Sequence, residues 1–200
     1  MPESIPRHKI TDPHALRALA HPLRLRLLEE LAVDGPLTAT ALAEKVGESP
    51  ANCSWHLRQL AKFGYLEEAP GGTGRQRPWR MVLRSHTWGD PSDDAELTQA
   101  GDAAVDIVMD HEYQALRDYR AWRARESPQW HAAAGSTQAI AWCTAEELDQ
   151  LNKTIGELVM PYLARLADPD SRPDGARLIR LVSWGVPGRP PAADEGESHA

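Results

Sequence analysis

The spacing of proline and glycine over residues 12–84 is the feature that most constrains the fold. These residues break the chain into stretches that suit only short elements. Four stretches combine helical spacing of apolar residues with start or stop signals: 13–20, 22–34, 38–47 and 50–63. The pattern predicts four short helices in succession.

The last two of these helices are predicted to be joined by a tight turn. Thr38 can cap the third helix, and Gly47 can take the left-handed conformation that a sharp exit requires. Ser49 and Pro50 then supply the cap and the first-turn proline of the fourth helix.

The fourth helix has two unlike sides. At 100° per residue, Cys53, Leu57 and Leu60 fall together, and we expect them in the core. The other sides of the helix carry Ala51, Asn52, Ser54, Trp55, Arg58, Gln59 and Lys62. This outer side is predicted to be exposed.

A β-hairpin is predicted directly after this helix. Residues 65–69 and 78–84 have strand character, and the glycine-rich residues 70–74 supply the turn. The segment 70–84 contains no acidic residue but four arginines: Arg75, Arg77, Arg80 and Arg84. Two short helices followed by a basic hairpin are typical of a winged helix-turn-helix.

Charge is divided unevenly along the chain. The protein carries a net charge of −7, but residues 1–84 hold 12 Lys and Arg against 9 Asp and Glu, whereas residues 85–200 hold 10 against 20. A basic first part suits a polyanionic partner, and an acidic second part suits a solvated or assembly-forming segment.

One long helix and a small lobe are predicted in the second part. Residues 94–126 contain no proline and predict a helix of about 45 Å, which is too long to be buried alone. Its apolar stripe needs a partner and consists of Leu97, Ala104, Val108, Ala115, Tyr119 and Trp122.

The predicted lobe consists of a strand, a helix and a strand. Residues 138–143 and 177–184 are the strand candidates, and Thr144 with Glu147 forms a capping box for the helix between them. Pro161 should kink or end that helix. The expected inner face of the helix consists of Leu148, Leu151, Ile155, Leu158 and Tyr162.

The expected fold class is therefore mostly α (α+β). We expect three parts: a winged helix-turn-helix domain over 12–84, a long dimerisation helix over 94–126 and a strand-helix-strand lobe over 138–184. The ends, 1–11 and 187–200, are expected to be disordered because they lack an apolar period.

The outer side of the fourth helix has the chemistry of a DNA-reading surface. Arg58 suits the O6 and N7 atoms of guanine, and Asn52 or Gln59 suits the edge of adenine. Ser49 and the helix N-terminus suit a backbone phosphate, and the hairpin arginines suit phosphates or a narrow minor groove. For Trp55, packing on the hairpin is favoured over contact with a thymine methyl group or a sugar.

These residues resemble the winged helix-turn-helix of ArsR-family bacterial repressors. The resemblance covers about residues 12–84 and rests on Ala43 and Gly47 four apart, on SPANCSWHLRQL at 49–60 with its SxHL element, and on FGYLEE before the basic hairpin. It implies a homodimeric transcriptional regulator, usually a repressor that a signal releases. The C-terminal extension is similar to that of a branch that does not sense metals.

The sequence departs from the metal-sensing members of that family. Residues 40–44 hold no cysteine where those members place a pair, and a single histidine stands among the second candidate ligands: Asp102, Asp106, Asp110, His111 and Glu112. Adjacent helical residues point about 100° apart, so a solvated charge cluster is favoured over a metal site. Cys53 and His56 are likewise favoured as packed residues. We expect no metal and no cofactor.

Five tryptophans lie beyond residue 84, namely Trp88, Trp122, Trp130, Trp142 and Trp184. They are the candidate residues for an apolar effector pocket. Ordinary core and dimer contacts are the favoured alternative, because each ring buries a large area.

Other classes of function are less well supported by the sequence. It contains no nucleophile turn, zinc helix or phosphate loop that predicts an enzyme. A winged-helix module for protein contacts without DNA affinity remains the alternative. No apolar run is long enough to span a membrane, and we expect the cytoplasm, with double-stranded DNA, a second copy of the chain and a small-molecule effector as partners.

Overall fold

The computed structural model describes residues 7–72, 76–82, 85–87 and 94–188. The described helices are α1 (Pro13–Leu19), α2 (Pro22–Asp34), α3 (Ala39–Val46), α4 (Pro50–Lys62), α5 (Ala95–Trp122), α6 (Pro128–Ala133) and α7 (Ala145–Ala167). The described strands are β1 (Arg7–Lys9), β2 (Leu66–Glu68), β3 (Trp79–Met81) and β4 (Ser85–Thr87). The prediction of a mostly helical fold with a winged helix-turn-helix is confirmed.

Local signals start and stop the first four helices where the sequence predicts. The Thr38 hydroxyl accepts a hydrogen bond from the Ala41 amide at 3.2 Å, and the Ser49 hydroxyl accepts one from the Asn52 amide at 3.2 Å. Gly47 ends α3 in the left-handed conformation at φ 71°. The tight turn between α3 and α4 therefore follows from residue types alone.

The hairpin packs against the start of α3. β2 and β3 pair in antiparallel fashion, and Trp79 also bridges Leu37. At Gly72 in the turn, φ is 80° and an added Cβ would overlap the Gln76 carbonyl, so only glycine fits there.

The core lies almost wholly in the first part of the chain. Its fully buried side chains are Leu16, Leu27, Leu31, Leu42, Cys53, Leu57 and Leu60. From α5 only Ala100, Gly101 and Ala104 are buried, and no described side chain after Ala104 is buried. The predicted stripe of α5 is thus covered at its N-terminal end by the chain itself, since α1 lies along that part of α5.

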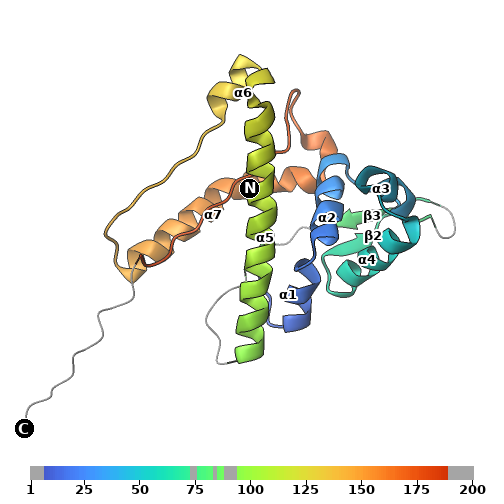
Figure 1. Ribbon diagram of the computed structural model, residues 1–200, viewed down its shortest axis with the longest axis horizontal. Helices are drawn as coiled ribbons and strands as arrows, with labels where there is room; N and C mark the ends of the chain where they lie inside the picture. The colour runs from blue at the N-terminus through green and yellow to red at the C-terminus, as the bar shows by residue number, and fades with distance from the viewer. Residues whose placement is uncertain (1–6, 73–75, 83–84, 88–93, 189–200) are drawn as a thin grey trace, which may run out of the picture.

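The long helix α5 divides the molecule. α1 to α4 and the hairpin lie on one side of it, whereas α7 begins on the other side and crosses α5, so that its C-terminal end lies on the side of α2 (Figure 1). A chain segment that follows α7, residues 172–186, returns along α7 toward its start, because the Asn152 side chain donates a hydrogen bond to the Gly185 carbonyl. We call this segment the arm.

The two strands predicted in the lobe do not form. Residues 138–143 and 177–184 are extended, but within the described part of the chain their backbones make no hydrogen bond with another backbone. A strand requires a paired neighbour, and the chain places none beside either segment. Alternation of apolar residues identified the extended conformation but not a partner.

One smaller expectation needs correction, one is narrowed, and one helix was not predicted. Residues 7–9 form β1, which pairs in parallel with β4, so the expected disorder of 1–11 is wrong for that stretch. α7 continues through Pro161 to Ala167 instead of ending there. Residues 128–133 form α6, which Ser127 caps and Pro128 begins. The expected disorder at 1–6 and 189–200 lies outside the described residues.

The predicted inner face of α7 is largely open. Leu151, Leu158 and Tyr162 are 50%, 68% and 57% exposed. Leu148 and Ile155, the other two members of that face, are half-buried. The helical periodicity is correct, but this chain does not bury the face that it identifies.

We predict that Leu57→Ala lowers the free energy of unfolding by about 2–5 kcal/mol, because the side chain is fully buried and its loss leaves a cavity. Urea unfolding followed by circular dichroism measures the change. Val33→Ala, at a site that is 42% exposed, is the matched control and should cost much less. Equal losses in the two variants would contradict the assigned core.

Candidate nucleic-acid interface

One side of α4 is buried and the other is open. Cys53, His56, Leu57 and Leu60 face the core, where α4 packs against α2 and α3. On the opposite side, Trp55 is 48% exposed. The remaining predicted contact residues of α4 are exposed (Ser49, Ala51, Arg58 and Lys62) or half-buried (Asn52, Ser54 and Gln59). The structure therefore leaves this side free to meet a ligand.

Two polar side chains on this open side already have partners. Arg58 donates a hydrogen bond to the Ser54 hydroxyl at 2.6 Å, which aligns the guanidinium along the surface of its own helix. Asn52 donates to a Glu48 carboxylate oxygen at 3.0 Å. Both contacts are exposed and local, so either side chain can exchange its partner for a base edge at little cost. Sequence reasoning missed the partner Glu48.

Trp55 packs on α2. Its ring meets His56 edge-on at 4.7 Å between centroids, and the Arg24 guanidinium lies 5.7 Å from the Trp55 ring centroid. The expected packing partner was the hairpin, whereas the contacts described for this ring are with Arg24 and His56. About half of the ring stays open beside Arg58.

The hairpin arginines are paired with acids on the facing strand. Arg77 lies 2.7 Å from a Glu68 oxygen, and Arg80 lies 2.7 Å from a Glu67 oxygen. The antiparallel register places Glu67 directly opposite Arg80. Exposed pairs of this kind contribute about 0–1 kcal/mol, so phosphates can compete for the arginines.

Both glutamates precede the acid-free segment 70–84, so the composition of that segment did not reveal these pairs. A hairpin register assigned from the sequence would have found them. Arg75, also predicted to contact DNA, lies outside the described residues.

A histidine and arginine cluster fixes α4 against α2. Arg24 donates from Nε to Nδ1 of His56 at 3.2 Å and from Nη1 to the Ala18 carbonyl at 2.8 Å. His21 caps α2 by accepting at Nδ1 from the Leu23 amide, and the His21 and His56 rings lie 4.5 Å apart. Both Nδ1 atoms act as acceptors, so each ring is neutral with its proton on Nε2.

Burial lowers the pKa of both histidines below the ordinary value of 6.5. For His21, nearby Arg24 adds to this effect, and for His56 both His21 and Arg24 do. Sequence reasoning did not identify this cluster, because its members come from α2 and α4 and meet only through packing. The cluster positions the base of Trp55 and so shapes the open side of α4.

We predict that this cluster makes the protein less stable below neutral pH. Because the folded state lowers these pKa values, the unfolded chain binds more protons below about pH 6.5. The contribution of the cluster is therefore present above that pH and is lost as the pH falls. Urea unfolding at pH 7.5 and 5.5 measures the loss.

His56→Gln should reduce this pH dependence, whereas His14→Gln, at an exposed position, should leave it unchanged. The same pH dependence in all three proteins would contradict the assignment.

The tryptophans predicted for an effector pocket do not gather in one place. Trp122 and Trp130 flank Arg177, whose guanidinium lies 5.9 and 4.8 Å from their ring centroids. Trp142 and Trp184 are 101% and 73% exposed. Trp88 lies outside the described residues.

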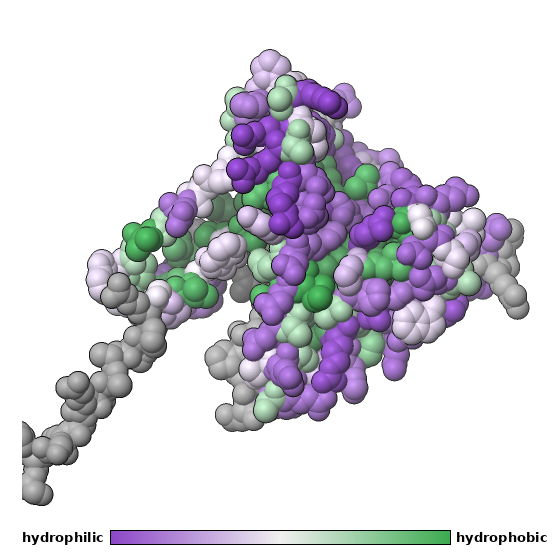
Figure 2. Space-filling view, viewed as in Figure 1, coloured by the Kyte–Doolittle hydropathy of each residue, from purple (hydrophilic) through white to green (hydrophobic). Residues whose placement is uncertain are grey.

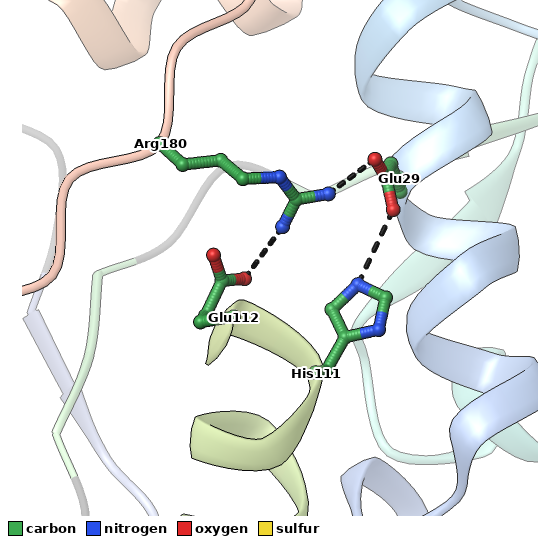
Figure 3. A network of polar contacts seen from close by, with 4 residues as sticks. All are labelled: Glu29, His111, Glu112 and Arg180. Carbon is green, nitrogen blue, oxygen red and sulfur yellow. Dashed lines mark hydrogen bonds and ion pairs between the residues drawn. The ribbon is translucent and has the colours of Figure 1, made fainter. Parts of the chain in front are cut away.

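Two of the α5 residues that were weighed as metal ligands, His111 and Glu112, contact charged residues of α2 and the arm. His111 lies 3.2 Å from a Glu29 oxygen of α2, and Glu112 lies 2.7 Å from Arg180 of the arm, which also contacts Glu29 (Figure 3). Cys53 is fully buried, and burial raises the pKa of its thiol. Within the described residues, no three potential ligands lie close enough to hold a metal ion.

A family model described as a helix-turn-helix domain matches residues 19–68, which include α2, α3, α4 and β2. The match covers the open side of α4 and the turn before it. No curated protein matches the chain. None of the described helices is both long and apolar enough to cross a bilayer. The chain thus contains a helix-turn-helix domain of the kind found in DNA-binding regulators.

Proposed function

We propose that this protein is a sequence-specific transcriptional regulator that binds double-stranded DNA. In this proposal it is a homodimeric, cytoplasmic repressor of the ArsR type that a non-metal effector releases. The observation that carries the proposal is the open side of α4, which presents Asn52, Arg58 and Gln59 beside a hairpin that carries Arg77 and Arg80. An α-helix fits the major groove, and a hairpin next to it can follow the phosphates.

The N-terminus of α4 supports a particular orientation on DNA. Ser49 and Ala51 are exposed there, and the first amide groups of a helix favour a phosphate oxygen. With a phosphate at this end, Arg58 lies two turns further along the groove and is the side chain best suited to read guanine. The Glu48 carboxylate repels a phosphate at this end of the helix. The repulsion is weaker while the Asn52 amide donates its hydrogen bond to that carboxylate.

A second copy is proposed to pair through the C-terminal half of α5. That half carries Tyr113, Leu116 and Trp122 at 55%, 40% and 40% exposure, whereas the N-terminal half is covered by α1. Two helix-turn-helix units related by a two-fold axis would read half-sites about one helical turn apart. A long helix with a free apolar half supports this arrangement.

Arg58→Ala is expected to weaken binding to the preferred duplex by about 1–3 kcal/mol and to relax its specificity, because a bidentate contact with guanine is lost. The duplex is first selected from random DNA at a stated salt concentration, and affinity is then measured by fluorescence anisotropy. Arg123→Ala, at an exposed site outside the proposed interface, is the control. Equal losses on the selected and a random duplex would refute base reading by Arg58.

Variants at Arg77 and Glu68 should have opposite effects on DNA affinity. Arg77→Ala is expected to weaken all sequences alike and to reduce the salt slope by about one unit, because one phosphate contact is lost. Glu68→Gln is expected to strengthen binding, since it frees Arg77 from its 2.7 Å ion pair. Salt titrations of both variants measure the slopes, and slopes equal to that of the wild type would contradict a phosphate contact.

The alternative, a winged-helix module for protein contacts, gains some support from the acids beside the hairpin arginines. The same titration separates the two functions. A DNA-binding protein loses affinity steeply with added salt through counterion release, whereas a protein-only module has no duplex affinity even at low salt.

A further inference from the structure

We propose that the outer surface of α7 and the arm is an interface for a second copy of this chain. We call this surface the C-terminal apolar face. Its most exposed members are Leu151, Leu158, Tyr162, Ile179, Leu181, Trp184 and Val186. The proposal rests on the proposed function only in taking the protein to be a dimer, and it assigns a contact beyond α5.

The α7 part of this face is a continuous stripe. Leu151, Leu158 and Tyr162 are seven and four residues apart, so at 100° per residue they lie on one side of the helix. The arm lies along a neighbouring side of α7, with Arg172 near Arg165 at one end and Gly185 near Asn152 at the other. Hydrophobic residues lie at the surface on the α7 side of the molecule in Figure 2.

The arm pairs two of its arginines with acids of the same chain and leaves its apolar side chains exposed. Arg177 pairs with Glu126 at 2.9 Å, and Arg180 pairs with Glu29 and Glu112 (Figure 3). Between and beyond these arginines, Ile179 and Leu181 are each 62% exposed and Trp184 is 73% exposed. A segment bathed in water would favour the reverse arrangement. The inversion indicates that the outer side of the arm is covered in the working assembly.

The exposed area contributes a large part of what a stable dimer buries. An aromatic side chain buries about 150–250 Å², so Tyr162 and Trp184, which are 57% and 73% exposed, offer on the order of 300 Å². The exposed aliphatic residues of the face add to this. A stable interface takes about 800 Å² from each partner, and a patch of this size is unusual on a monomer.

A second copy suits this face better than a charged partner does. Arg177 and Arg180 are paired with acids of the same chain, so neither arginine presents an unpaired charge to an identical face. A two-fold axis can then bury the same residues of both copies against each other.

The test is sedimentation equilibrium of the full chain with two matched variants. Leu181→Glu places a charge within the face, and we expect it to weaken the dimer at least 100-fold, because the carboxylate would be buried without a partner. Thr40→Glu adds the same charge at an exposed residue of α3, away from α7 and the arm, and should leave the dimer unchanged. Circular dichroism compares the helix content of all three proteins.

Hydrogen exchange provides a measurement that does not depend on any variant. In this chain alone, residues 177–184 have no backbone hydrogen-bond partner within the described part, so their amides should exchange quickly. Slow exchange in the wild-type dimer supports the proposal.

Three results would overturn the proposal: a wild-type monomer at tens of micromolar, a dimer that Leu181→Glu does not weaken, or fast exchange of 177–184 in the dimer. If only the second or third occurs, dimerisation through α5 survives. None of these results bears on the proposal that the protein binds DNA, which is measured separately.

Discussion

The burial of one side of α4 is the constraint on which the rest of the structure depends. Leu57 and Leu60 are fully buried against α2 and α3, and this packing fixes which side of the helix faces solvent. If α4 were rotated about its axis by one residue, or about 100°, Arg58 would leave the surface that it shares with Trp55. The histidine cluster reinforces the same orientation from the direction of α2, because Arg24 joins His56 to the end of α1. The core thereby determines the reading surface.

Electrostatics on this surface are more balanced than the sequence suggests. Glu67 and Glu68 each pair with an arginine that would otherwise attract DNA, and Glu48 accepts a hydrogen bond from the amide of Asn52. Exposed pairs exchange readily, so they lower affinity without blocking the site. Such a balance favours a complex that depends on base contacts rather than on phosphate attraction alone, which is what sequence-specific binding requires.

Local signals predicted most of the first part of the fold. Caps at Thr38 and Ser49 and the left-handed Gly47 are properties of adjacent residues, so the sequence was sufficient to place α3 and α4. Pairs that depend on register or packing, such as Arg80 with Glu67 and Arg24 with His56, join residues far apart and were not found.

The strands predicted at 138–143 and 177–184 do not form for a related reason. Alternation of apolar and polar residues predicts an extended chain, but it does not show that another strand lies beside it to pair with. The open stripe of α7 has the same cause, since periodicity identifies an apolar face without saying which molecule covers it. Both disagreements fall beyond Ala104, where no side chain that the structure describes is buried.

The most direct measurement of the central claim is an NMR titration of the full chain with its selected duplex, observed through the indole N–H signals. The Trp55 signal, assigned with Trp55→Phe, should shift on addition of DNA, because about half of this ring is open on the surface that meets the groove. The signal of Trp142, far along the chain from α4, should stay in place. Saturable DNA binding with an unchanged Trp55 signal would contradict the account.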